Sequence, residues 1–196
     1  MSKILALLTI SYVFFQIKCV NSAQHTYNLG RNSAVVNTGV HKCANGRNSE
    51  VTFSVDATLH AKSTTRTNFG NGKNVNNRMR ELNSQRSDHK GHILASVFGG
   101  PAQIWNLAPQ ADNLNRKYRC RTSILNVWYD CEKWILNELN SKRNLPVRVK
   151  VRLSYKDRSC RPTHWSIDAR SRSGSGCQAL NIRNGNLPFG ACQRAG

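Results

Sequence analysis

The chain carries the sequence SDHKGHILASVFGGPAQIWNLAPQADNLNR at residues 87–116, and this stretch decides the fold and the chemistry that we expect. A histidine follows a glycine near its start (Gly91-His92), and asparagines come later at Asn106 and Asn115. A neutral imidazole can take a proton from water, and amide oxygens are suitable ligands for a hard cation. The order of these groups therefore predicts a site that hydrolyses phosphodiester bonds.

The charge of the whole chain suits a polyanionic substrate. Its 196 residues include 29 Lys and Arg against 10 Asp and Glu, which gives a formal net charge of +19. A small domain needs a net charge of only about 2 to 8 for solubility. The excess therefore predicts salt-dependent attraction to phosphates or to anionic membranes.

Residues 1–23 have the composition of a secretory signal peptide. Lys3 precedes an apolar run over residues 4–17, and small residues close the segment at Ser22 and Ala23. The run is shorter than the roughly 20 residues that span a membrane, and the sequence has no second such run. We expect cleavage near Ala23, secretion of one domain over residues 24–196 and no stable membrane association. The sequence gives no signal of an oligomeric state.

The cysteines agree with secretion. Seven are present, and Cys19 lies in the predicted signal segment, which leaves an even number for disulfides. No CxxC pair occurs among them, so a zinc site is not expected. Closeness in sequence favours the pairs Cys120–Cys131 and Cys177–Cys192, which leaves Cys43 to pair with Cys160.

Hydrophobic periodicity predicts an α+β domain. Apolar and polar residues alternate over residues 51–59, 147–155 and 165–169, which is typical of half-buried strands. Apolar side chains at three- and four-residue steps from Leu125 to Leu139 predict an amphipathic helix. We also expect an irregular lead-in at 24–48 with a short strand at 34–37, a loop or hairpin at 67–78, a strand at 79–85 and a disulfide-tied tail at 171–196.

Three cations lie on the polar face of the strand predicted at residues 147–155. Arg148, Lys150 and Arg152 alternate with the apolar residues and so project to the opposite side of the strand. They either follow a phosphate backbone or form the solvated side of the strand. The sequence does not decide between these two interpretations.

The motifs DHKGHILASVFGG, NLAPQ and LNR, in this order, resemble those of the DNA/RNA non-specific endonuclease family, a branch of the ββα-metal nucleases. The later RPTHWSIDA, with Tyr155 upstream, is similar to a strand of its bacterial toxin-like members. The resemblance covers residues 50–170. It implies a ββα-metal core with a mixed, mainly antiparallel sheet and one long helix, and a metal-dependent enzyme that cleaves DNA and RNA.

The resemblance also implies roles for individual residues. His92 matches the general base, and Asn115 matches the single direct protein ligand of one Mg²⁺ ion, with Mn²⁺ as the alternative cation. Asn115 would equally suit a helix start, where asparagine is a common cap. Asn106 matches an asparagine that supports the site, and it is as typical of a turn.

An acidic residue of the predicted helix is expected to complete the site. Glu132 is the candidate for the acid that orients the water around the ion, and Glu138 is the alternative. Either residue would otherwise be an ordinary solvated helix charge. Glu132 follows Asn115 at a longer distance than in relatives, which requires an insertion that contains Cys120.

The first motif departs from the family pattern, which commonly has an arginine two residues before the histidine. Lys90 stands in the place of this arginine and His89 in that of the preceding aspartate, with Asp88 one residue earlier. We expect Lys90 to offset negative charge on the phosphate, although lysine lacks the forked geometry of arginine. Asp88 is expected to supply the acid, and His89 to be a surface residue.

Nucleic acid is expected to contact the cations around these motifs, which are Arg86, Arg116, Lys117 and Arg119. The altered first motif leaves an alternative open, in which the chain is a catalytically impaired nucleic-acid-binding protein or a secreted effector or toxin on the same scaffold. A membrane-active cationic protein is less favoured, because the predicted helix carries several acids on its polar face.

Overall fold

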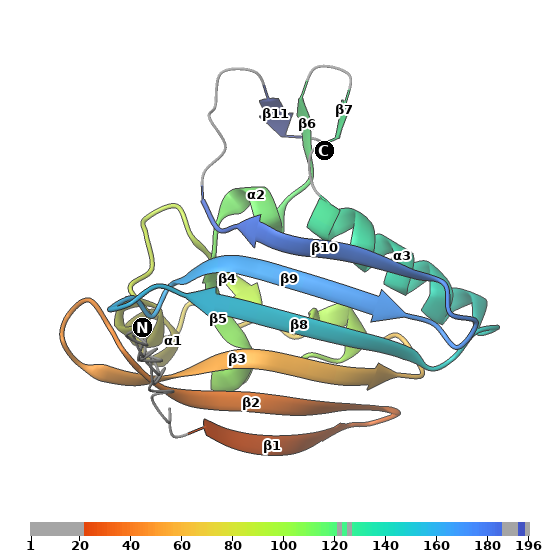
Figure 1. Ribbon diagram of the computed structural model, residues 1–196, viewed down its shortest axis with the longest axis horizontal. Coiled ribbons are helices and arrows are strands. Elements are labelled where there is room, and N and C mark those ends of the chain that lie inside the picture. Colours follow the sequence, from red (N-terminus) through yellow and green to blue (C-terminus); the bar gives the residue numbers. More distant parts are fainter. Residues whose placement is uncertain (1–21, 121–122, 125–126, 186–191, 195–196) are drawn as a thin grey trace, which may run out of the picture.

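A six-stranded antiparallel sheet forms the body of the computed structural model, which describes residues 22–120, 123–124, 127–185 and 192–194 (Figure 1). The strand order is β1-β2-β3-β8-β9-β10. The strands are β1 (Ser22–Leu29), β2 (Asn32–Lys42), β3 (Asn48–Leu59), β8 (Val147–Tyr155), β9 (Pro162–Arg170) and β10 (Gly176–Arg183).

The chain leaves this sheet after β3 and returns to it at β8, which pairs directly with β3. The excursion carries all the helices that are described, with bounds α1 (Lys73–Glu81), α2 (Asp112–Asn115) and α3 (Val127–Ser141), and short 3₁₀ turns at Ser96–Phe98 and Ile104–Asn106. It also carries the strands β4 (His89–His92), β5 (Leu107–Gln110), β6 (Tyr118–Cys120) and β7 (Ser123–Ile124), while β11 (Cys192–Arg194) pairs with β6.

The excursion contains the ββα unit that the sequence predicted. β4 pairs with β5 in antiparallel register, and α2 follows β5 after a single residue. The α+β fold class, the mainly antiparallel sheet, the long helix and the disulfides are confirmed. The strands predicted at 51–59, 147–155 and 165–169 are parts of β3, β8 and β9.

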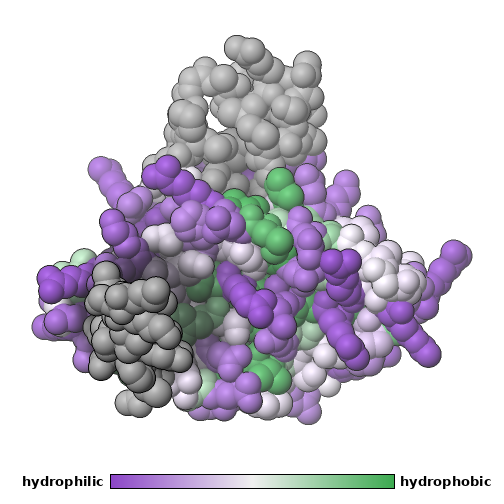
Figure 2. All heavy atoms as spheres, in the orientation of Figure 1, coloured by the Kyte–Doolittle hydropathy of each residue, from purple (hydrophilic) through white to green (hydrophobic). Residues whose placement is uncertain are grey.

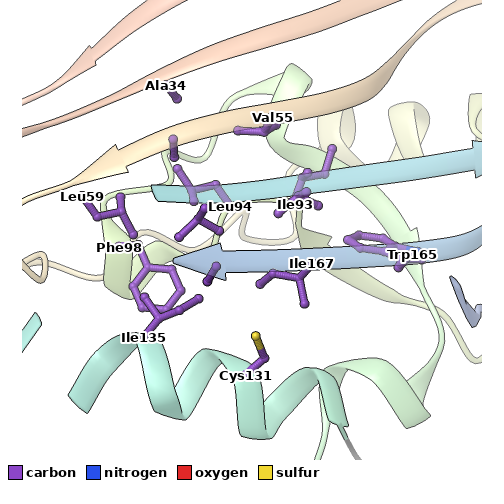
Figure 3. Packing of buried hydrophobic residues seen from close by; sticks show 14 of the residues in the cluster. Ala34, Val55, Leu59, Ile93, Leu94, Phe98, Cys131, Ile135, Trp165 and Ile167 are labelled. Atoms are coloured by element: carbon purple, nitrogen blue, oxygen red, sulfur yellow. The ribbon is translucent and has the colours of Figure 1, made fainter. Parts of the chain in front are cut away.

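The hydrophobic core lies between the sheet and the excursion. Cys131 and Ile135 of α3 point towards the sheet, where they meet side chains such as Ile167 (Figure 3). Leu94 and Phe98, from the segment after β4, fill the same layer. The opposite face of the sheet is the one seen in Figures 1 and 2, and hydrophilic side chains cover much of it. Within the described part of the chain, none of the helices is long and apolar enough to span a membrane.

Two predictions for the first half of the chain are wrong. The irregular lead-in expected at 24–48 is instead the hairpin β1–β2, although the short strand predicted at 34–37 is confirmed as part of β2. The inward side chains of β2 include the polar residues Asn32 and Thr38, so that the apolar alternation is weak. The strand expected at 79–85 and the second half of the loop expected at 67–78 are replaced by α1 and its end, while residues 67–72 form a loop as predicted. Val75, Met79 and Leu82 lie at steps of four and three residues, and the last two are buried, as in an amphipathic helix.

The tail expected after residue 170 contains the edge strand β10. Its inner side is only partly apolar, with Ala179 buried, and the chain shifts register between Ala179 and Ile182. An irregular edge strand has little alternation for sequence analysis to detect, because one of its sides has no strand partner.

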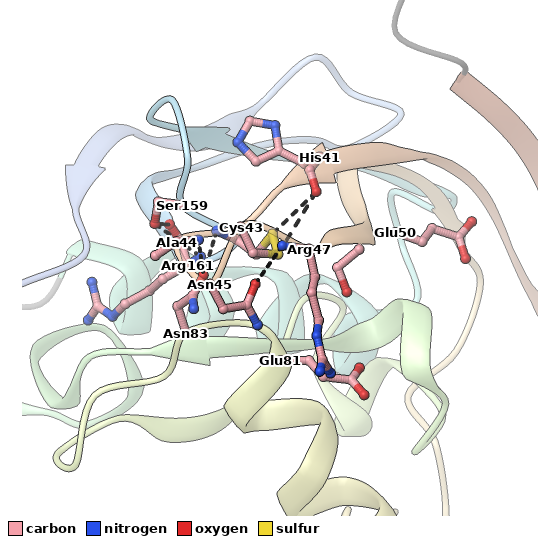
Figure 4. The surroundings of a disulfide bond; sticks show 12 residues. His41, Cys43, Ala44, Asn45, Arg47, Glu50, Glu81, Asn83, Ser159 and Arg161 are labelled. Carbon is pink, nitrogen blue, oxygen red and sulfur yellow. Dashed lines mark hydrogen bonds between the residues drawn. A yellow bond between two sulfur atoms is a disulfide. The ribbon is translucent and has the colours of Figure 1, made fainter.

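The structure corrects the predicted disulfides. Cys43–Cys160 is confirmed, and Asn83 supports it by accepting hydrogen bonds from the backbone N–H groups of Ala44 (3.1 Å) and Cys160 (3.3 Å) (Figure 4). Cys131 pairs with Cys177, so both short-range pairs that we expected are wrong. The physical reason is the packing of α3 along β10, which brings distant cysteines together. In the backbone register of β6 and β11, Cys120 lies opposite Cys192.

Candidate active site

A pocket of about 330 Å³ opens where β4, β5, α2 and α3 meet. His92, Asn115 and Glu132 all line it, so the predicted base, ligand and helix acid share one site. They come from a strand, a four-residue helix and a long helix. The wall also includes residues that sequence analysis did not select, which are Arg66, Gln110, Tyr129 and Lys133.

The glycine before His92 is required by the pairing of β4 with β5. Gly91 lies opposite Ala108, and a Cβ atom at Gly91 would be 2.5 Å from the Cβ atom of Gln110 and 2.8 Å from its Oε1. Gln110 is itself buried and lines the pocket. Any larger residue at position 91 would therefore displace Gln110 and separate the strand that carries His92 from its partner.

The His92 imidazole is held in a form that can accept a proton. The backbone of Thr67 bonds to the ring, while Nε2 is buried and has no partner within the described residues. The Thr67 bond therefore uses Nδ1. Burial lowers the pKa of His92 below its ordinary value of 6.5, and the Thr67 bond opposes this shift more weakly. The Phe69 ring also packs on the imidazole, with 4.3 Å between ring centroids.

Lys90 fastens the loop that carries Thr67 and Phe69. Its ammonium donates to the carbonyl of Gly70 (2.6 Å) and to Oδ1 of Asn71 (2.8 Å), and Lys90 does not line the pocket. The expected contact of Lys90 with a phosphate in the pocket is thus not what the structure shows. The same loop supplies Arg66 as a pocket cation. Arg66 could not be selected from the sequence, because it lies in a polar segment without a motif.

Glu132 faces the pocket from the first half of α3. The indole N–H of Trp128, one turn earlier, donates to its Oε1 at 3.0 Å. Loss of hydration raises the pKa of Glu132 from 4.5 to about 7, and the Trp128 bond lowers it by a smaller amount. Glu138, the alternative acid, accepts a bond from Asn144 (3.3 Å) and lies outside the pocket wall.

Asn115 is exposed at the end of α2, so the alternative interpretation, in which it caps the start of a helix, is wrong. The start of α2 is fixed by Asn184, another residue that sequence analysis missed. Its Oδ1 accepts from the N–H of Ala111 (2.7 Å), and its Nδ2 donates to the carbonyls of Pro109 (2.9 Å) and Pro162 (2.8 Å). One buried amide thus joins β5, α2 and β9.

Asn106 has a structural position and does not reach the pocket. It is fully buried, and its Oδ1 accepts from the N–H of Leu94 at 2.7 Å. Its Nδ2 donates to the carbonyls of Leu94 and Pro101, both at 3.0 Å. Because its amide is engaged in these bonds, Asn106 supports the site from a distance, by fixing the turn that follows His92.

Asp88 and His89 also differ from expectation. The Asp88 side chain is completely buried and accepts two bonds from the guanidinium of Arg161, at 2.6 and 2.7 Å. It is committed to this ion pair and does not supply an acid to the pocket. His89 is partly buried instead of lying free at the surface, because its Nε2 lies 2.6 Å from Oδ1 of Asp112 in α2. Arg116 binds the same carboxylate oxygen at 2.9 Å.

The other predicted cations are dispersed. Lys117 lies over the Tyr129 ring with 5.6 Å from Nζ to the ring centroid, Arg86 lines a separate groove, and the side chain of Arg119 is outside the described residues. Arg148 and Arg152 project from the face of the sheet opposite to α3 and the pocket. The solvated-strand interpretation is therefore the better one for these two residues.

The pocket suits a hydrated hard cation. Among the described residues, no cluster of three or more His, Cys, Asp or Glu could hold a metal. Mg²⁺ keeps several of its waters and needs few protein oxygens. The exposed carboxamide of Asn115 and the carboxylate of Glu132 supply such oxygens on neighbouring walls. This donor set fits Mg²⁺ and lacks the ligands of a closed zinc site.

Comparison with known proteins gives three findings. The model of the family described as DNA/RNA non-specific endonuclease matches residues 46–173. The chain is 32% identical over 81 residues to the type VII secretion system protein EssD of Staphylococcus aureus strains USA300 and NCTC 8325 / PS 47. That match covers 41% of this chain and 12% of the length of EssD. The solved structure of NucA from Streptococcus agalactiae with magnesium ion bound aligns over 85% of both chains, with 15% identity and a TM-score of 0.47.

Proposed function

Because the chain belongs to the DNA/RNA non-specific endonuclease family, we propose that it hydrolyses phosphodiester bonds of both DNA and RNA, with His92 as the general base. One observation carries this proposal. The imidazole of His92, whose Nε2 has no partner among the residues that the structure describes, lies in the same pocket as Asn115 and Glu132, within a strongly basic chain.

Each residue of the pocket has a separate role in the proposed hydrolysis. The bond from Nδ1 to Thr67 fixes the tautomer, so that Nε2 can accept the proton of an attacking water. Asn115 and Glu132 would hold a hydrated Mg²⁺, or alternatively Mn²⁺, which when bound supplies positive charge at the phosphate. Arg66 and Lys133 line the pocket and offset negative charge that develops on the phosphate oxygens. Contacts of this kind address the backbone, so we expect weak sequence preference.

Export of the protein is part of the proposal. The two disulfides described are typical of oxidising compartments. The name of the staphylococcal relatives, a secretion system protein, points the same way. We propose secretion after cleavage near Ala23, and β1 begins at Ser22, next to this point. A role in digestion, clearance or attack on other cells would follow from the place of release.

The proposal is tested by incubating the secreted protein with plasmid DNA and with RNA, in Mg²⁺ or in chelator. We expect cleavage that chelator abolishes. His92→Ala should lower kcat by roughly 10²–10⁴-fold, the scale of general-base catalysis. His60→Ala is the matched control, because His60 is exposed and lies outside the pocket wall. Equal cleavage by wild type and His92→Ala would remove the base from its role, and binding without cleavage would favour the catalytically impaired alternative.

A further inference from the structure

A second hollow of about 680 Å³ lies between α1 and the segment that leads into β4. Four cations line it, Lys73, Arg80, Arg86 and Lys90, together with neutral amides such as Asn76. We call this hollow the α1 groove. Neither the family's motifs nor the proposed catalytic residues require it.

The surface of the α1 groove has little negative charge to offset its cations. Asp88 is the one acidic residue among the described residues of its wall, and Arg161 neutralises this buried carboxylate. The guanidinium of Arg80 donates a hydrogen bond to the side-chain oxygen Oδ1 of Asn77, which holds it in place. Lys73 and Arg86 have no ion pair or hydrogen bond from their side chains to any described residue, so they are available to an anion.

The α1 groove lies beside the catalytic pocket along β4. Lys90 and His92 are two residues apart on β4, so their side chains leave the same face of the strand, roughly 7 Å apart. The loop between the two hollows contributes to both, with Arg66 in the pocket wall and Asn71 in the groove wall. A nucleic-acid strand with one phosphate in the pocket would therefore reach the α1 groove once it passed this loop.

The other candidate surfaces fit a polyanion less well. On the outer face of the sheet, Lys150 pairs with Asp56 (3.2 Å) and Arg170 with Asp168 (3.3 Å), on the side away from His92. The hollow near β1 contains Glu50, and its two large rings, Tyr27 and Trp105, already stack on each other at 4.8 Å.

We infer that the α1 groove binds the phosphate backbone of the nucleic acid that flanks the scissile bond, whichever its bases are. This inference rests on the proposed function, since it concerns the same substrate. Cations combined with neutral hydrogen-bond donors are the usual means of contacting phosphates without reading sequence. The groove would make the enzyme favour polymers over short diesters.

The test compares the variant Lys73→Gln/Arg80→Gln/Arg86→Gln with Arg148→Gln/Arg152→Gln/Arg170→Gln, which removes the same charge from the outer face. Lys90 is kept because it fastens the loop over His92. Binding of an oligonucleotide of about 16 nucleotides, a length typical of a single-strand site, is measured in chelator on a His92→Ala background. The groove variant should bind about tenfold more weakly, and the slope of log affinity against log salt should fall by about 2. The outer-face variant should change affinity less than about twofold.

A cleavage assay with His92 restored completes the test. For long RNA the groove variant should show a raised KM, while for a dinucleotide its kcat/KM should match that of the outer-face variant. Equal weakening of binding by both triple variants would overturn the inference, because the loss of affinity would then depend on the net charge of the protein and not on the position of the cations. Loss of dinucleotide cleavage in the groove variant alone would also overturn it. Failure of the wild type to cleave anything would contradict the proposed nuclease activity, while the binding comparison would still decide on the groove.

Discussion

The six-stranded sheet and the corner made of β4, β5 and α2 are held together in different ways. The sheet strands are 8 to 12 residues long, and the inner ones, β2, β3, β8 and β9, bury alternate, mostly apolar side chains over one continuous core. The corner has two four-residue strands and a four-residue helix, and single polar side chains such as Asn106 and Asn184 fix it. Stability is therefore spread over the sheet, while the geometry of the site depends on a few hydrogen bonds.

The largest effect should come from opening the covalent link across the sheet. Cys43→Ser/Cys160→Ser removes a crosslink between residues 117 positions apart. The loop-entropy model gives about 5 kcal/mol for a loop of this size, and about 4 kcal/mol for Cys131–Cys177. Urea unfolding of the two double variants measures these losses. Because neither bond touches the pocket, the variant that remains folded at low temperature should keep most of its cleavage activity. A loss below about 1 kcal/mol would mean that the sheet does not depend on the crosslink.

The next largest effect should come from removing the Asn106 amide, on which the corner of β4, β5 and α2 depends. Asn106→Ala leaves the N–H and C=O of Leu94 and the C=O of Pro101 buried without partners, which should cost about 2–4 kcal/mol. Asn37→Ala is the matched control on the sheet, where the amide donates to Ser54 near the surface and should contribute less than about 1 kcal/mol. Chemical unfolding and cleavage rates are measured for both. Equal losses in the two variants would contradict the difference between the regions.

The third prediction concerns the stability that the protein loses by burying the Glu132 carboxyl group in the site. In chelator, Glu132 ionises near 4.5 when unfolded and at about 7 when folded. The folded state therefore binds the extra proton between these values, and stability falls as pH rises through this window. Glutamine stays neutral, so Glu132→Gln should be more stable than wild type by about 1–3 kcal/mol at about pH 8, and nearly equal to it at about pH 4. Thermal unfolding at both pH values measures this, and a difference that does not vary with pH would contradict it. Cleavage should be lost.

The smallest effect separates two roles for Lys90. If it fastens the loop, Lys90→Met lowers kcat about tenfold and lets water reach His92. Burial is the larger cause of the lowered His92 pKa, so the acid limb of the pH–rate profile should then move up towards 6.5. Lys90→Arg keeps donors for the loop and should behave as wild type. A lower rate with an unmoved acid limb would instead indicate direct contact of Lys90 with the phosphate.

The same contrast between the sheet and the corner explains which elements can be predicted from the sequence. The strands around Val149 and Ile167 were predicted because alternate burial leaves a period of two, and the helix around Ile135 because it packs one face on the sheet. The motif order placed His92, Asn115 and Glu132 in one pocket. Helix α1 was missed although Met79 and Leu82 have helical spacing, because polar residues surround them.

What the sequence could not reveal are contacts between distant segments. Arg161 forms an ion pair with Asp88, which is 73 residues away in the sequence, and Asn184 accepts a hydrogen bond from Ala111 across the same separation. Arg66 enters the pocket through a loop whose position is set by Lys90 and by Thr67, which donates to the carbonyl of Gly100 (2.9 Å). Each of these depends on tertiary packing, and no local periodicity encodes it.

The Cys43–Cys160 bond turns the chain between these residues into a covalent ring, and His92, Asn115 and Glu132 all lie inside it. A protease that cuts one exposed loop in this ring opens it without releasing a fragment. Both halves remain on the same molecule, so the catalytic groups stay together after the first nick. If the protein is secreted as proposed, this ring would delay inactivation by proteases until a second cut.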